Sequence, residues 1–172
     1  MLTILIPLRD EEENLPHIVR NFDENIKEIN YEVILVNDFS KDKTLEEAKK
    51  ISIKNEKYQT FDNQKKGLGG AINLGISKAK GNYICIFMAD LSDDVNDIKK
   101  YYKLMKDKKI DAVFGSRFLK SSMVKDYPMS KLILNRVFNL IVKILFLSRY
   151  NDFTNAFKIY NSDVLKSFLP LV

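Results

Sequence analysis

Cysteine, which can cross-link a chain, and histidine, which titrates near neutral pH, are scarce in this sequence. Their scarcity argues against disulfide bonds and against catalysis by these two residue types. The 172 residues include one cysteine and one histidine. Cys85 has no partner for a disulfide, and its position within an apolar run predicts a small buried side chain rather than a reactive thiol. His17 falls near the polar side of a predicted helix, where a solvated side chain is expected rather than a catalytic one.

Long apolar runs are also missing. The first run, 2–6, is too short for a signal peptide, and no basic residues precede it. The most apolar stretch, 131–147, is 17 residues long and contains several polar positions, so it is too short and too polar for a transmembrane helix. We therefore expect a cytoplasmic chain.

The charge is moderately basic. Lysine and arginine number 28 against 23 acidic residues, which gives a net charge of +5 and an isoelectric point near 9.1. This balance fits a partner that carries phosphate or an anionic membrane surface. Basic runs interleaved with aromatic residues are missing, so nucleic acid is not an expected partner. The length fits one domain with a single substantial core.

Short apolar runs alternate with stretches of helical periodicity over the first two thirds of the chain. Strands are predicted at 2–6, 32–36, 58–61, 83–88 and 111–114, with helices between them. This alternation implies parallel pairing and right-handed crossovers. The predicted fold is a doubly wound α/β sheet, with its functional edge at the carboxyl ends of the strands.

Polar or glycine-containing groups follow four of these strands. They are 7–13 (Pro-Leu-Arg-Asp-Glu-Glu-Glu), 37–40 (Asn-Asp-Phe-Ser), 89–90 (Ala-Asp) and 115–117 (Gly-Ser-Arg). Parallel topology brings such groups to one edge, so together they predict a site. Asp38 is suited to accept hydrogen bonds from a nucleobase N–H edge or a ribose hydroxyl.

Two further stretches suggest phosphate chemistry. After the 83–88 run, Asp90, Asp93 and Asp94 appear within five positions and could hold a divalent cation against a phosphate. An acidic first helical turn, which the helix dipole favours, explains them equally well. The glycine-rich turn 64–70 lets backbone approach a ligand closely and opens a helix, but it is neither a Walker A loop nor a Rossmann fingerprint.

Five of these segments, in order, resemble family 2 of the inverting glycosyltransferases, which have the GT-A fold. They are Ile-Pro-x-x-x-Glu-Glu-Glu-Asn-Leu, Val-Asn-Asp-Phe-Ser-x-Asp-x-Thr, Lys-Gly-Leu-Gly-Gly-Ala, Ala-Asp-Leu-Ser and Gly-Ser-Arg. The segment 152–158 is similar to the Asp-x-x-Ser-Gly-Phe-Arg/Lys segment of the dolichol-phosphate mannose synthase-like, or polyprenyl-phosphate sugar synthase, branch. The resemblance runs from Leu2 to about Leu165.

The resemblance implies a UDP- or GDP-linked sugar as donor and Mg²⁺ or Mn²⁺ as cofactor. It implies that Pro7, Arg9, Glu11 and Asp38 line the nucleoside pocket. It also implies that Lys66 and Gly67 contact the donor near its phosphates and that Asp90 binds the metal. Arg117 matches an arginine near the phosphates, a role that suits a guanidinium fork.

This chain departs from the family pattern at several positions. Met88 replaces the first acid of the Asp-x-Asp motif, and a thioether is a poor ligand for a hard cation. Asp90 would then bind the metal with the diphosphate and water, aided by Ser92, Asp93 or Asp94. Asn155-Ala156 stands in place of Ser-Gly, and the chain ends soon afterwards, which implies a truncated chain or an incomplete acceptor side.

The resemblance implies attack by an acceptor oxygen on the anomeric carbon as the nucleoside diphosphate leaves from the opposite face. A polyprenyl phosphate is already ionised and needs no base, whereas a saccharide hydroxyl needs one, for which Asp152 is the candidate. Asp152 as a helix cap or surface charge is the plain alternative. A third hypothesis is a catalytically weak nucleotide-sugar-binding domain.

The stretch 131–147 is expected to form a helix with a wide apolar face and a narrow polar stripe at Asn135 or Arg136, Asn139 and Lys143. Such a helix suits a membrane interface at the inner face of the membrane, and the alternatives are packing on the domain or a contact in a homo-oligomer. We expect residues 1–120 to form the nucleotide-sugar-binding core and 121–172 the acceptor-side part of the same domain.

Overall fold

The computed structural model describes residues 1–119 and 129–171 of the chain. The elements in chain order are β1 (Leu2–Leu8), α1 (Leu15–Asn25), β2 (Tyr31–Asn37), α2 (Thr44–Lys54), β3 (Tyr58–Asp62), α3 (Leu68–Lys78), β4 (Tyr83–Ile86), α4 (Val95–Lys108), β5 (Ala112–Phe114), α5 (Met129–Leu145), β6 (Lys158–Asn161) and α6 (Ser162–Ser167). They form two compact units: unit 1 comprises Met1–Val113 with Phe157–Val172, and unit 2 comprises Phe114–Ala156. The change of pattern that the sequence shows near 120–128 lies outside the described residues.

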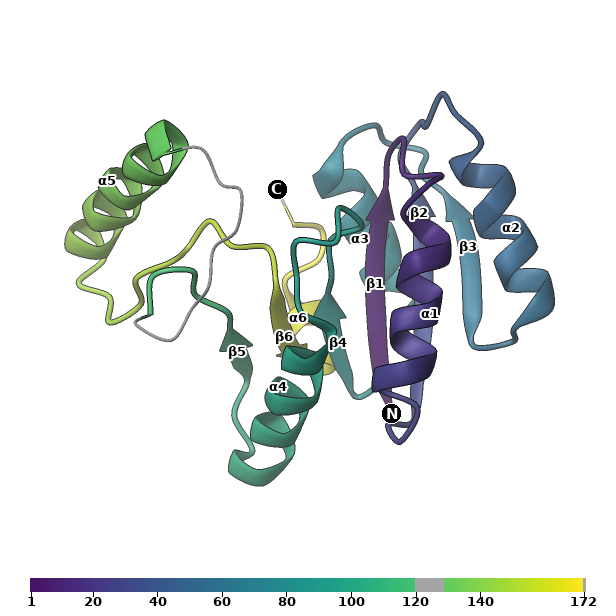
Figure 1. Cartoon of the computed structure of the whole chain (residues 1–172). Coiled ribbons are helices and arrows are strands. Elements are labelled where there is room, and N and C mark those ends of the chain that lie inside the picture. Colours follow the sequence, from purple (N-terminus) through teal and green to yellow (C-terminus); the bar gives the residue numbers. More distant parts are fainter. Residues whose placement is uncertain (120–128, 172) are drawn as a thin grey trace. The chain divides into compact units, whose positions relative to one another are not determined.

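The sheet has the strand order β3-β2-β1-β4-β6-β5 (Figure 1). Strands β3, β2, β1 and β4 pair in parallel, which confirms the predicted doubly wound, mostly parallel α/β sheet. The chain moves outward from β1 to β3 and then crosses back through α3 to β4 on the other side of β1. Such a reversal opens a crevice beyond the carboxyl ends of the two adjoining strands, where ligands bind in open α/β sheets.

Strand β6 and helix α6 are not predicted from the sequence. β6 pairs antiparallel with β4, and only Ile159 among its four residues is fully buried. A four-residue strand with one buried apolar position carries too weak an alternation to be recognised. Asn161 then caps α6, because its side chain accepts hydrogen bonds from the backbone N–H groups of Asp163 and Val164.

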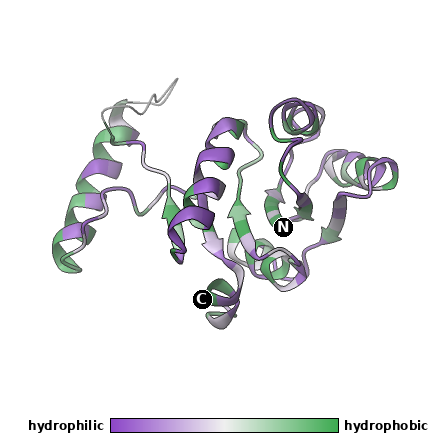
Figure 2. Cartoon of the chain, turned by 90° about the horizontal axis from the view of Figure 1, so that it is seen from below, coloured by the Kyte–Doolittle hydropathy of each residue, from purple (hydrophilic) through white to green (hydrophobic). Residues whose placement is uncertain are grey.

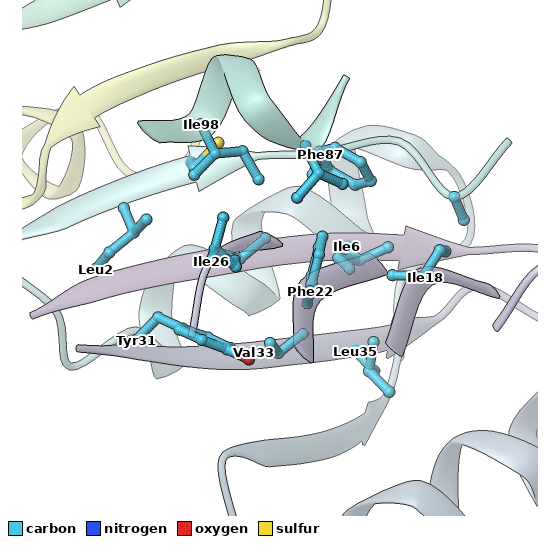
Figure 3. Close-up of a cluster of buried hydrophobic side chains, with 14 of the residues drawn as sticks. Leu2, Ile6, Ile18, Phe22, Ile26, Tyr31, Val33, Leu35, Phe87 and Ile98 are labelled. Atoms are coloured by element: carbon cyan, nitrogen blue, oxygen red, sulfur yellow. The ribbon is translucent and has the colours of Figure 1, made fainter. Parts of the chain in front are cut away.

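Both faces of β1 are buried, which explains why its sequence is a continuous apolar run rather than an alternating one. Leu2, Ile4 and Ile6 belong to a core on the side of α1 and α4, whereas Leu5 belongs to a second core with residues of α3 and α6. Figure 3 shows the first core. There the rings of Phe22 and Phe87 meet edge to face, with centroids 5.3 Å apart.

Three sequence-based expectations can be compared with the structure. Cys85 is fully buried, as predicted, and burial raises the pKa of its thiol. β4 ends at Ile86, two residues earlier than predicted, although the Phe87 N–H still donates to the Leu5 carbonyl at 3.0 Å. Among the described residues, no helix has both the length and the apolar character needed to cross a bilayer.

Candidate functional site

Asp38 lies just beyond β2 and is 4% exposed. Its Oδ1 accepts hydrogen bonds from the Gly67 backbone N–H and the Asn63 Nδ2, both at 2.8 Å. Its Oδ2 lies 3.9 Å from Nη1 of Arg9, a half-exposed side chain. One oxygen of Asp38 therefore anchors the glycine-rich turn, and the other faces the end of β1.

Asn63 is the centre of this arrangement, and the sequence pattern gave no sign of it. It is 6% exposed, and besides Asp38 its Nδ2 donates to the Lys65 carbonyl at 2.6 Å. Its own N–H donates to the Asn37 carbonyl at 2.9 Å. A single buried amide thus joins the ends of β2 and β3 to the turn that precedes α3.

The turn itself requires glycine. Gly67 has φ of +113°, a conformation that side chains with a Cβ rarely adopt. A Cβ on Gly70 would lie 1.8 Å from the Lys65 carbonyl oxygen, so backbone packs directly against backbone here. Lys66 precedes Gly67 and is exposed, which leaves its ammonium group accessible to an anion.

The acid-rich segment after β1 is held to the segment after β2 by reciprocal hydrogen bonds. The Asp10 N–H donates to Ser40 Oγ, and the Asp10 carboxylate accepts from the Lys41 N–H at 2.6 Å. Glu12 makes the same exchange, donating to Asp42 and accepting from the Lys43 N–H. Because these carboxylates accept hydrogen bonds from backbone N–H groups, the clustering of acidic residues in this segment is explained by the structure of the loop.

Glu11 belongs to the same segment. Its N–H donates to Thr44 Oγ1 at 2.7 Å, and its carboxylate accepts from Asn14 Nδ2 at 2.7 Å. A hollow of about 280 Å³ adjoins it. That hollow is lined by Asp10, Glu11, Glu12, Glu13, Asn14 and Asp42. Pro7 is buried near the carboxyl end of β1.

The three carboxylates after β4 separate into different roles. Asp94 is the N-cap of α4 and accepts from the Asn96 N–H at 2.8 Å. Asp93 accepts from the Met88 N–H at 3.1 Å and so braces the chain just past the strand. Asp90 is exposed and, within the described part of the chain, accepts a hydrogen bond from the Ser92 N–H at 3.0 Å.

Asp94 is exposed too, but it caps α4, so Asp90 is the exposed carboxylate that a cation can engage without removing a helix cap. Within the described part of the chain, no three His, Cys, Asp or Glu side chains are grouped closely enough to hold a metal by themselves. One accessible carboxylate fits a hard cation that takes its remaining ligands from phosphate oxygens and water. The residues present thus fit a metal shared with a diphosphate.

Asp152 and Arg117 form a tight ion pair in unit 2. Arg117 Nη2 donates to Asp152 Oδ1 at 2.8 Å, while Arg117 Nε and its backbone N–H both donate to Oδ2 at 2.9 Å. The Asp152 side chain is 0% exposed, and the Arg117 side chain is 25% exposed. Thr154 Oγ1 and the Asn155 N–H also donate to Oδ1 of Asp152 at 3.2 Å.

The pKa of Asp152 follows from these contacts. Burial by itself would raise that pKa, but hydrogen bonds from the Arg117 side chain and backbone, the charge of Arg117 and the Thr154 hydroxyl together lower it below its usual value. A carboxylate with a lowered pKa and five donors around it is a weak proton acceptor. The geometry favours a role in orienting Arg117.

Helix α5 exposes apolar side chains around most of its circumference. Figure 2 shows hydrophobic positions along the whole helix, with hydrophilic ones between them. The apolar residues that are half or more exposed in this region are Met129, Ile133, Leu134, Val137, Phe138, Leu140, Ile141, Ile144, Leu145, Phe146 and Leu147. Its buried residue is instead the polar Asn139, at 2% exposure.

The family follows from a comparison of the sequence with protein-family models. Residues 3–169 match the model described as "Glycosyl transferase family 2". The chain belongs to glycosyl transferase family 2. Because the match covers nearly the whole chain, it includes both units.

Two curated relatives have names that refer to dolichol phosphate. A "Dolichol-phosphate mannosyltransferase" of Pyrococcus furiosus is 29% identical over 135 residues, which cover 78% of this chain and 38% of that protein. A "Dolichyl-phosphate beta-glucosyltransferase" of Dictyostelium discoideum is 27% identical over 190 residues, which cover 98% of this chain and 56% of that protein. This chain thus spans between about a third and just over half of the length of these relatives.

Solved structures confirm the GT-A fold that the sequence motifs imply. Glucosyl-3-phosphoglycerate synthase from Mycobacterium tuberculosis, with Mn²⁺, UDP and glucosyl-3-phosphoglycerate, has a TM-score of 0.72 at 12% identity over 97% of this chain and 58% of its own. The mannosyltransferase PcManGT from Pyrobaculum calidifontis, with GDP-Man and Mn²⁺, has a TM-score of 0.66 at 17% identity over 98% of this chain and 46% of its own.

The structure brings some predicted site residues together and shows others the sequence did not reveal. In unit 1, Asp38, Gly67 and Arg9 meet, and Asp90 lies four residues past β4, where it accepts from the Ser92 N–H. In unit 2, Arg117 and Asp152 are paired. Asn63, Asn139 and Thr154 were missed as site candidates, because an isolated amide or hydroxyl has no sequence signature of its own.

Proposed function

We propose that this chain transfers a sugar from a nucleoside-diphosphate sugar to a polyprenyl phosphate, with inversion at the anomeric carbon. Family membership supports the transferase activity, and the names of the two relatives support a dolichyl-type acceptor. The observation that carries the choice of acceptor is the state of Asp152. Its carboxylate is buried and ion-paired, which suits an acceptor that is already ionised.

We assign donor binding to the residues at the carboxyl edge of the sheet. Asp38 would accept hydrogen bonds from the base or ribose, with Pro7, Arg9 and Glu11 lining the nucleoside pocket. Lys66 and the Gly67 backbone would face the donor phosphates, since the turn before α3 combines an exposed ammonium group with a helix N-terminus.

Asp90 would hold Mg²⁺ or Mn²⁺ together with the diphosphate. When bound, the metal would neutralise charge on the leaving nucleoside diphosphate. Met88 supplies a thioether where a second acid is usual, so the diphosphate becomes the main source of metal ligands. We therefore expect metal binding by this chain to depend strongly on the nucleotide.

The acceptor phosphate would act without a protein base. The second pKa of a phosphate monoester is about 6, so its oxygen is largely ionised at neutral pH. Arg117 is assigned to stabilise the charge on the leaving diphosphate, and Asp152 holds its guanidinium in place. Arg117 and Arg136 also lie over the same ring, that of Phe118, with each guanidinium carbon 5.6 Å from its centroid.

Helix α5 is assigned to the surface of an anionic membrane. Its apolar side chains are exposed, and between Met129 and Ala156 Asp152 is the single acidic residue of the sequence, against four lysines and arginines. An apolar helix with basic positions and no acidic ones suits the boundary between headgroups and acyl chains. Such a helix would bring the chain to the membrane in which a polyprenyl phosphate resides.

A transfer assay tests the proposal. A panel of UDP- and GDP-linked hexoses is incubated with polyprenyl phosphate, with the uncharged polyprenol, or with an oligosaccharide, in Mn²⁺ or in EDTA. We expect metal-dependent product with the phosphate acceptor only. Between pH 5 and 8, the transfer rate should follow the ionisation of the acceptor phosphate, with its pKa of about 6, and not the titration of a protein base.

Asp90→Asn is the variant that tests the metal assignment, with Asp94→Asn as its matched control. Asparagine caps a helix as well as aspartate does, so Asp94→Asn should keep activity. Asp90→Asn should lose most of it. Transfer to the oligosaccharide would contradict the assigned acceptor, and tight nucleotide binding without any turnover would contradict the transferase itself.

A further inference from the structure

Asn139 is an unusual residue for its position. It is the buried residue of α5, at 2% exposure, on a helix whose apolar side chains lie mostly exposed. Burying an amide costs free energy unless its polar atoms are hydrogen-bonded, so its partners should explain its presence.

Those partners fix the orientation of the amide. Oδ1 accepts from the Phe153 backbone N–H at 2.5 Å, while Nδ2 donates to the Asn135 carbonyl at 2.8 Å and to Thr154 Oγ1 at 3.2 Å. A backbone N–H can only donate and a carbonyl can only accept, so the flipped amide would lose both contacts. Asn139 therefore points a donor at Thr154.

The Thr154 hydroxyl is equally constrained. It accepts from Arg117 Nη2 at 2.7 Å and from Asn139 Nδ2 at 3.2 Å, both of which are donors only. Its single proton is thus left to donate to Asp152 Oδ1, at 3.2 Å. One hydroxyl joins the helix amide, the guanidinium and the carboxylate, and all of its hydrogen-bonding capacity is used.

We propose that Asn139 is a positioning residue that acts through Thr154 to hold the guanidinium of Arg117 in its paired orientation. The inference rests on the proposed function, in which Arg117 stabilises the leaving diphosphate. It extends that function by making the membrane-facing helix α5 a support for the guanidinium. Asp152 holds one edge of the guanidinium through Nε and Nη2, and Thr154, held in turn by Asn139, accepts a further hydrogen bond from Nη2.

The competing interpretation is that Asn139 only links α5 to the 151–155 loop and so has a purely structural role. In that case, replacing Asn139 would change the stability of the protein and leave the reactivity of Arg117 unaffected. A positioning role predicts that Arg117 responds to loss of the Asn139 amide and of the Thr154 hydroxyl in the same way, and that serine at 154 restores the behaviour because it keeps the hydroxyl.

The first measurement is transfer kinetics with polyprenyl phosphate. Asn139→Leu and Thr154→Val should each lower kcat about tenfold, the equivalent of one lost hydrogen bond, with the donor KM changed less than about twofold. Thr154→Ser should stay near wild type. The double variant Asn139→Leu/Thr154→Val should be no slower than either single variant, because both remove the same link.

The second measurement does not depend on turnover. The rate at which phenylglyoxal modifies Arg117, followed by peptide mapping, should rise severalfold in Asn139→Leu and Thr154→Val and stay at the wild-type value in Thr154→Ser. Asn25→Leu is the matched control, because Asn25 Nδ2 makes the same contact to a carbonyl four residues earlier, that of Asn21, at 2.9 Å. It should leave Arg117 unchanged.

The outcomes separate the two claims. If wild type transfers no sugar to any acceptor, the proposed function fails, and the modification rates still decide the role of Asn139. If Asn139→Leu lowers only the melting temperature, with Arg117 modification and kcat at wild-type values, the positioning role is overturned. Additive effects in the double variant would overturn it as well, since the two residues would then act separately.

Discussion

The Asp152–Arg117 pair shows how one residue's chemistry is set by its neighbours. An exposed aspartate near a reacting hydroxyl is a reasonable general base. Here the carboxylate is buried, and side-chain and backbone donors of Arg117 occupy both of its oxygens. The same residue that sequence alone offers as a base becomes the support for a guanidinium.

Replacing Asp152 by asparagine should destabilise the protein at neutral pH. Breaking a fully buried pair costs about 3–5 kcal/mol, and we expect about 2 kcal/mol here because Arg117 is partly exposed. The pKa of Asp152 is lowered in the folded state, so the stabilisation is complete above the unfolded-state pKa of about 3.9 and is lost as the pH falls through the folded-state value.

Urea denaturation of wild type and Asp152→Asn at several pH values measures this effect. The difference in free energy of unfolding should be full at pH 7 and shrink as the pH drops below about 4. Asp107→Asn, at an exposed position of α4, serves as the control and should change little. A difference that stays constant down to low pH would mean that the charge of Asp152 is unimportant.

At the scale of elements, α3 depends on a close approach to β1. A Cβ on Gly75 would lie 1.9 Å from Cδ1 of Leu5, which is fully buried. The glycine therefore lets the helix lie directly on the strand that precedes the candidate donor pocket. Gly69, in the first turn of the same helix, has no atom within 4 Å of such a Cβ.

Gly75 and Gly69 of α3 should respond in opposite directions to alanine. Gly75→Ala should destabilise the fold by about 1–3 kcal/mol through overpacking against Leu5. Gly69→Ala should be neutral or stabilise by up to about 1 kcal/mol, since alanine has the higher helix propensity. Thermal or urea unfolding of the two variants gives the comparison, and equal effects would contradict the predicted contact at Gly75.

Helix α5 should bind anionic vesicles through its apolar side chains. Changing Phe138, Ile141 and Leu145 to serine should weaken binding by about 3 kcal/mol, more than a hundredfold, at about 1 kcal/mol for each partly inserted side chain. Sedimentation with phosphatidylcholine–phosphatidylglycerol vesicles measures it.

A matched control for the α5 variant is available in unit 1. Ile53, Leu104 and Ile110 are also exposed apolar residues, at 86%, 37% and 37%. Serine at these three positions should leave vesicle binding unchanged. Vesicle binding that survives the α5 substitutions would remove the helix from the membrane-binding role.

At the scale of the whole molecule, nucleotide and metal should stabilise the fold together. A ligand at a hundred times its dissociation constant adds about 2.7 kcal/mol to the free energy of unfolding when it binds only the folded state. UDP or GDP with Mn²⁺ should therefore raise the melting temperature, and EDTA should reverse most of the gain. In Asp90→Asn the nucleotide effect should no longer depend on Mn²⁺, and a retained dependence would place the metal elsewhere.

Much of the architecture of unit 1 can be predicted from local sequence patterns. The apolar runs of β1 and β2 and the Gly67 turn are signals within a few residues, so the parallel sheet and the family could be predicted from them. Asp38 was recognised because it follows a predicted strand. Strand β6 was not, since its four residues become a strand only through pairing with β4.

Only the tertiary structure determines which of several chemically equivalent side chains stabilise the fold and which remain accessible to a ligand. Three carboxylates follow β4, and only the structure shows that Asp93 braces the chain at Met88 and that Asp94 caps α4, whereas Asp90 is exposed and caps no helix. Asn63 and Asn139 owe their roles to partners distant in sequence or on another element. A sequence specifies which polar groups exist, but burial and the geometry of their partners determine which of them are left for a ligand.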